Sequence, residues 1–293
     1  MGLYQFLQNN IFNRHVETDL LAFIDIEVDA NDKVQDYGAF IEPNRELHTT
    51  HQKEFDNFVG TAQYLCGHNI IHHDLNYLPH QSAKKAIDTL YLSPLLFPKR
   101  PYHKLLKDDK LQSDELNNPL NDSLKARDLF YDELNAFATL ADNLKQIYTS
   151  LLENQKEFKN FFNYIDFHVE NINLEQLIKE HFANSICINS PISDIIKHTP
   201  IELAYALALI STGDTLSVTP PWLLYNFPHI ENVLQKISNT PCHDANCKYC
   251  STQLNIHKNL SKIFGYQQFR TFDGEPMQER AVQAAVDGKS LLT

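Results

Sequence analysis

Residues Leu20–Val28, LLAFIDIEV, form an apolar run into which two acidic residues, Asp25 and Glu27, are set. The length and β-branched content of the run predict a buried strand. Because successive side chains of a strand point to opposite faces, Asp25 and Glu27 project from the same face. Two carboxylates buried together are costly unless a hard divalent cation such as Mg²⁺ or Mn²⁺ compensates them. The alternative is an amphipathic strand whose acids face water.

The segments that follow alternate between strand and helix patterns. Residues 34–42 are typical of a strand that returns from a turn, and residues 64–69 of a short strand and turn before a helix around 73–78. Another short element is expected over residues 88–92, closed by Pro94, and a helix that contains Asp122 begins at Pro119. The first part of the chain is therefore predicted to be an α/β domain.

Three acidic motifs follow one another in this region. The chain here resembles the DEDD family of 3′→5′ exonucleases, over roughly residues 19–135. The first motif is Asp25-Ile26-Glu27, and the second is Gly67-His68-Asn69 followed by Asp74. Asp122 stands where the third aspartate falls, after an Asp88-Thr89-Leu90 that also matches family members. The resemblance implies a ribonuclease-H-like fold, a mixed sheet flanked by helices, for a domain over residues 15–140. It also implies a metal-dependent 3′-5′ exonuclease.

The resemblance also implies roles for these residues. Two Mg²⁺ or Mn²⁺ ions would be held by four carboxylates, those of Asp25, Glu27, Asp74 and Asp122. One ion would generate the attacking hydroxide, and the other would stabilise the leaving 3′ oxygen. His68 and Asn69 are placed to shape the substrate-binding end of the second strand, with a hydrogen-bonded structural role favoured for His68.

The expected general base is missing. Family members carry a histidine five residues before the third aspartate or a tyrosine four before it, and here those positions are Asn117 and Asn118. An amide has no useful basicity. His103 lies nearby in sequence without a specific feature that recommends it. The enzyme is expected to rely on metal-activated water, with Asn117 in the base position. The alternative is a catalytically weakened module that binds DNA 3′ ends.

The rest of the chain divides into a helical region over residues 141–240 and a different segment over 241–293. In the latter, Cys242, Cys247 and Cys250 have a spacing suited to tetrahedral zinc, and we expect a structural Zn²⁺. His257 is the favoured fourth ligand, while His243 or a residue from elsewhere remains open. Three reduced cysteines without a metal are the alternative.

A second resemblance follows the cysteines. The sequence Phe264-Gly265-Tyr266, with Phe269-Arg270 after it, resembles the entry motif of RecQ-like helicases, and Gln278 is the candidate for their adenine-contacting glutamine. Gly288-Lys289-Ser290 is not a phosphate loop, because the position five residues before it is Gln283 and not glycine. We therefore expect the N-terminal part of an exonuclease–helicase fusion, with a RecQ-like helicase domain as its partner.

Composition bounds these interpretations. The 293 residues carry a formal net charge of −12, which argues against a general nucleic-acid coat but not against a nuclease with metal-bound carboxylates. No apolar stretch is long enough for a membrane span, and the cysteine usage favours a cytoplasmic protein. The expected partner is nucleic acid, most readily DNA, in repair or defence against foreign DNA. An interaction scaffold is the third hypothesis.

Overall fold

The computed structural model describes residues 20–100, 102–105, 118–170, 172–212, 219–242, 244–287 and 289. Asn117, His243 and the first residues of the expected exonuclease domain lie outside these ranges. The chain forms two compact units. The first comprises Met1–Val169 with Thr215–Pro220, and the second comprises Glu170–Asp214 with Pro221–Thr293. The expected boundary at residue 140 lies inside the first unit.

The first unit contains a mixed five-stranded sheet, so the α/β class predicted from the sequence is confirmed. The strand order is β3-β2-β1-β4-β5, in which β1, β2 and β3 pair antiparallel while β1, β4 and β5 pair parallel. The strands are β1 (Leu21–Val28), β2 (Val34–Ile41), β3 (Arg45–Thr49), β4 (Tyr64–Gly67) and β5 (Lys85–Asp88). The acidic strand β1 is therefore central in the sheet.

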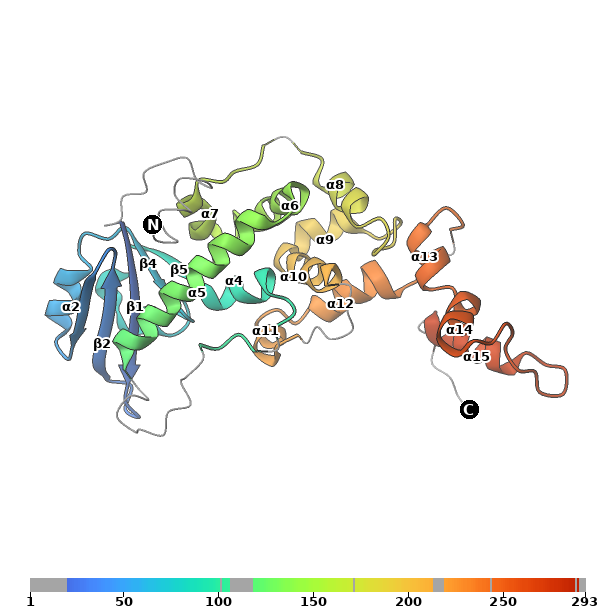
Figure 1. The fold of residues 1–293 in the computed structure, drawn as a ribbon, viewed down its shortest axis with the longest axis horizontal. Helices are drawn as coiled ribbons and strands as arrows, with labels where there is room; N and C mark the ends of the chain where they lie inside the picture. The colour runs from blue at the N-terminus through green and yellow to red at the C-terminus, as the bar shows by residue number, and fades with distance from the viewer. Residues whose placement is uncertain are drawn as a thin grey trace. The chain divides into compact units, whose positions relative to one another are not determined.

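Helices lie on both faces of this sheet (Figure 1). They are α2 (Gln52–Phe58), α3 (Asp74–Tyr77), the 3₁₀ turn η2 (Pro79–Gln81), α4 (Thr89–Leu96), α5 (Pro119–Thr139), α6 (Asp142–Leu152) and α7 (Lys159–Ile165). Pro94, expected to close a short element, lies inside α4. The helix continues past it, and the Phe97 N–H donates to the Ser93 carbonyl at 2.8 Å.

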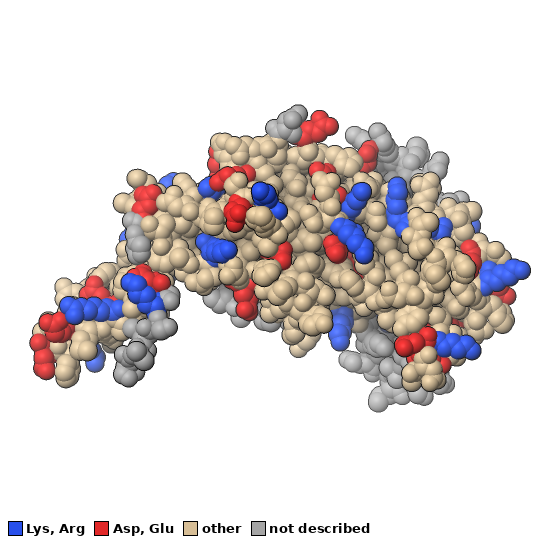
Figure 2. Space-filling model, turned by 180° about the vertical axis from the view of Figure 1, so that it is seen from behind, with Lys and Arg blue, Asp and Glu red and all other residues tan. Residues whose placement is uncertain are grey.

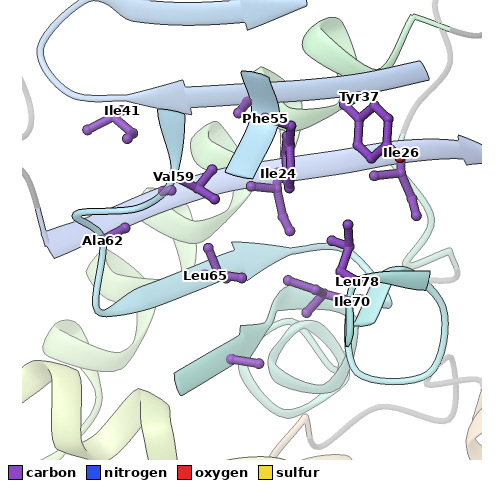
Figure 3. Packing of buried hydrophobic residues seen from close by; sticks show 13 residues of the cluster. Ile24, Ile26, Tyr37, Ile41, Phe55, Val59, Ala62, Leu65, Ile70 and Leu78 are labelled. Atoms are coloured by element: carbon purple, nitrogen blue, oxygen red, sulfur yellow. The ribbon is translucent and has the colours of Figure 1, made fainter. Parts of the chain in front are cut away.

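Because successive side chains of β1 point to opposite faces of the sheet, its apolar residues belong to two different cores. Ile24 and Ile26 are buried against Phe55 of α2, in the apolar cluster shown in Figure 3. Phe23 points to the opposite face, where its ring lies 5.8 Å from that of Phe130 and 5.9 Å from that of Tyr131, both on α5. Asp25 and Glu27 share the face of Phe23, so they lie on the side of the sheet that α5 covers.

The second unit is helical among its described residues. Its elements are α8 (Leu174–His181), α9 (Ile192–His198), α10 (Pro200–Ser211), α11 (Pro221–Asn226), α12 (Ile230–Leu234), the π-helix η3 (Gln235–Asn239), α13 (Lys248–Gln253), α14 (Ile256–Phe264) and α15 (Met277–Val286). No helix among the described residues of either unit is long and apolar enough to cross a membrane.

Candidate metal centres

Three carboxylates converge at the central strand. One ligand oxygen from each of Asp25, Glu27 and Asp122 lies within 4.8 Å of the other two, and all three side chains are partly buried. Asp25 and Glu27 come from β1, as the strand periodicity predicts, and Asp122 comes from the first turn of α5. A donor set made only of carboxylate oxygens suits hard divalent cations such as Mg²⁺ and Mn²⁺.

The start of α5 lies over this site, where it is capped by Asn118 and approaches the strand closely at a glycine. The Asn118 side chain accepts hydrogen bonds from the Leu120 and Asn121 N–H groups at 3.0 and 3.3 Å, and Pro119 occupies the first helical turn. Beneath them lies Gly38, the cross-strand partner of Asp25. A β-carbon on Gly38 would lie 2.1 Å from the Pro119 carbonyl carbon. The absence of a side chain there lets the helix rest on the strand.

Asp74, the fourth expected carboxylate, is not among the three that converge. It is buried, and its Oδ1 accepts the Ile26 N–H at 3.0 Å. That amide needs a partner because the pairing of β1 with β4 covers only Leu21 to Phe23. The Asp74 Oδ2 lies 3.6 Å from Nδ1 of His73. Burial raises the pKa of Asp74, and the hydrogen bond to Asp74 raises the pKa of His73. The structure therefore gives Asp74 a role in positioning β1.

His68 and Asn69 build the turn that follows β4. The His68 Nδ1 pairs with the Thr89 hydroxyl at 2.9 Å, and burial lowers the pKa of His68 to about 4. Asn69 has a left-handed φ of 68°, and its N–H donates to Asp88 at 2.8 Å. These contacts are those of structural residues, the role that the sequence favoured for His68.

Asp88 is a buried carboxylate with a structural role that the sequence motif did not reveal. It accepts hydrogen bonds from the N–H groups of Asn69, Ile71 and Leu90, and the last of these caps α4. Burial raises its pKa to about 7, although the three amides oppose that shift. Asp88 therefore joins the turn after β4 to the start of α4.

The general base is not identified among the described residues. Asn117 lies outside them. His103 is buried, its Nδ1 pairs with the Ser93 hydroxyl at 2.8 Å, and burial lowers its pKa to about 4. A histidine held in this way is a structural partner of α4 and is poorly suited to accept a proton from water near neutral pH.

The second unit contains a cluster of four cysteines that could hold a metal such as zinc. The Sγ atoms of Cys187, Cys242, Cys247 and Cys250 all lie within 4.8 Å of one another. Cys247 caps α13, and its Sγ accepts the Cys250 N–H at 3.5 Å. Although burial acts in the other direction, the Asp244 backbone and the Cys187 thiol lower the pKa of Cys242 to about 7. Burial instead raises the pKa of the neighbouring Cys187 and Cys250 thiols, so metal binding at the cluster would release protons.

The fourth member of this cluster is Cys187 and not His257. The His257 Nε2 pairs with a Glu279 carboxylate oxygen at 2.9 Å, and its ring packs 5.5 Å from that of Phe269. The choice of His257 was wrong because local spacing favoured a nearby residue, whereas Cys187 reaches the cluster from the segment between α8 and α9. The available signal was that Cys187 is one of only five cysteines in the chain.

Gln278 lies beside the segment that the second resemblance singled out. Its Oε1 accepts the Arg270 N–H at 3.0 Å, and it lines a cavity of about 580 Å³ together with Tyr266 and Phe269. Gly265 ends α14 with a left-handed φ of 73°. This geometry places the glutamine next to the Phe269-Arg270 pair.

Charges of both signs lie interspersed over the face drawn in Figure 2, on a largely uncharged surface. No family model, curated protein or solved structure matches the chain. The two family resemblances therefore stay predictions from the motifs.

Proposed function

We propose that the first unit is a metal-dependent 3′-5′ exonuclease with a ribonuclease-H-like fold that acts on DNA 3′ ends. The observation that carries this proposal is the convergence of Asp25, Glu27 and Asp122 at the central strand of a mixed sheet. Divalent cations held by these carboxylates would supply Lewis acidity for water attack and for departure of the 3′ oxygen.

The residues of the chain prepare this chemistry in distinct ways. Asp25 and Glu27 are held by a strand that pairs with β2 at both positions, and Asp122 is held by a capped helix. Asp74 holds the Ile26 amide between the two strand carboxylates. Rigid elements of this kind keep the ligands in place before the metal binds, which reduces the cost of reorganisation.

We further propose that the cysteine cluster is a structural zinc site. Four thiolates without an open ligand position are typical of structural zinc, whereas catalytic sites keep one position for water. The second unit would then carry a zinc-tied element followed by the start of a RecQ-like helicase segment, in which Gln278 and its neighbours contact a nucleotide. A linked helicase would expose the strand ends that the first unit trims.

The decisive experiment is a cleavage assay on a 3′-labelled single-stranded oligonucleotide with Mn²⁺. Asp25→Asn should lower the rate about 10²-fold or more, because a two-metal site would depend on each carboxylate that holds the ions. The matched control is Asp128→Asn, which removes an exposed carboxylate from α5 that pairs with Arg127 at 2.8 Å. Equal cleavage by all three proteins would exclude the triad as the active site. Mn²⁺ binding without cleavage would instead favour the weakened, end-binding module.

A further inference from the structure

A lysine side chain lies at the edge of the carboxylate triad. The Lys125 Nζ donates to Asp122 Oδ1 at 3.2 Å, from one helical turn further along α5. The Asp122 side chain is 15% exposed and that of Lys125 is 30% exposed. The ammonium group therefore contacts a partly desolvated carboxylate of the triad, while its own side chain still reaches solvent.

The chain contains a second pair with the same geometry. Lys145 donates to Asp142 at 3.2 Å, also with a spacing of three residues and also from the first turn of a helix, α6. Asp142 is 89% exposed, and the Lys145 side chain is 18% exposed. Pairs of this kind stabilise a helix only slightly. The two pairs differ in that Asp122 belongs to the triad and Asp142 does not.

Membership of Asp122 in the triad means that Lys125 lies close to three negative charges in the proposed nuclease. Three carboxylates within 4.8 Å repel one another, and the ammonium of Lys125 offsets part of that repulsion at Asp122. A divalent cation that binds the triad would compete with Lys125 for the Asp122 carboxylate and would repel the ammonium. Lysine is a strongly hydrated point charge on a flexible stem, so its head group swings away at little cost.

We propose that Lys125 is a phosphate-positioning residue of this site. This inference rests on the proposed nuclease function. Lys125 neutralises Asp122 until a divalent cation takes the oxygen, and its ammonium then contacts a non-bridging oxygen of the substrate phosphodiester. A contact to phosphate carries no base information, so the substrate class is a single-stranded polynucleotide end without sequence preference.

Two binding measurements test this role without relying on turnover. The first is calorimetric titration of Mn²⁺ alone into the parent chain, Lys125→Ala and the matched control Lys145→Ala. Lys125→Ala should bind Mn²⁺ roughly two- to fivefold more tightly than the parent, because a competing ion pair is gone. Lys145→Ala should match the parent, although it loses an equivalent helix pair.

The second measurement is the affinity for a fluorescent single-stranded oligonucleotide at several salt concentrations, with Ca²⁺ in place of Mg²⁺ to prevent cleavage. Lys125→Ala should bind more weakly, and its salt slope should fall by about 0.7, the value for one lost phosphate contact on a single strand. Identical metal affinities and salt slopes for Lys125→Ala and Lys145→Ala would overturn the proposal. Failure of the parent to bind Mn²⁺ would instead overturn the nuclease function.

Discussion

Replacing Gly38 by alanine tests how the triad is assembled, because the added methyl group meets the start of α5. The new β-carbon would lie 2.1 Å from the Pro119 carbonyl carbon and 2.2 Å from the Leu120 nitrogen. These are backbone atoms, which cannot rotate away as a side chain does. Ordinary van der Waals contact begins at 3.4 Å, so the helix start has to withdraw by roughly 1 Å.

Two effects of this substitution oppose each other. Alanine in a strand interior is favoured over glycine by roughly 0.5–1 kcal/mol when nothing obstructs it. Overpacking against rigid neighbours costs typically 1–3 kcal/mol. We expect the clash to dominate, with a net loss in the free energy of unfolding. Because Asp122 moves with the helix, a displacement near 1 Å should lower the cleavage rate about 10²-fold and weaken Mn²⁺ binding.

The assays are urea unfolding, Mn²⁺ calorimetry and cleavage of a labelled single strand, applied also to Gly60→Ala as the matched control. A methyl group on Gly60 meets the carbonyl oxygens of Asn57 and Asp56 at 3.2 Å, so a small adjustment accommodates it. The control should keep its metal affinity and cleavage rate. A Gly38→Ala protein that is more stable than the parent, with unchanged metal affinity, would refute the reasoning that α5 rests on this glycine.

Two further predictions concern the remaining buried groups. Cys187→Ser should lower the zinc content from about one per chain and reduce the melting temperature. The control Cys66→Ala removes a buried cysteine outside the cluster and should keep the zinc. Elemental analysis measures the zinc content of both variants. Glu133 is fully buried, both its carboxylate oxygens lack a hydrogen-bond partner in the described part of the chain, and burial raises its pKa well above 4.5. The folded state then keeps a proton that the unfolded chain releases, so stability should fall as the pH rises above about 4.5 toward the folded pKa. Glu133→Gln should flatten that decline and add roughly 1–3 kcal/mol at pH 7, measured by urea unfolding across pH.

The sequence contained enough to predict most of the triad. Strand periodicity placed Asp25 and Glu27 on one face, and the structure confirms that both lie under α5. The expected start of α5 at Pro119 is also confirmed, and with it the position of Asp122 in the first turn. These features depend on local rules of strand alternation and helix capping, which a sequence displays directly.

The features that the sequence did not reveal depend on contacts between distant segments. Asp74 has the spacing of a metal ligand, and its Oδ1 also accepts the Ile26 amide where β4 stops pairing with β1. Cys187 joins the cysteine cluster only because the helical unit brings its loop to α13. In both cases residue type and spacing were clues to chemistry, whereas the contact itself depends on tertiary pairing.

The acidic balance of the chain restricts how the proposed nuclease can hold DNA. A net charge of −12 repels a polyanion, and Figure 2 shows charges of both signs interspersed over the face that it draws. The attraction therefore has to be local. Divalent cations at the triad would reverse the sign of the carboxylate cluster, and Lys125 adds one positive charge at its edge. Affinity for DNA would then depend on metal bound at one point of the surface. Such local binding suits an enzyme that binds a strand end better than a protein that coats a duplex.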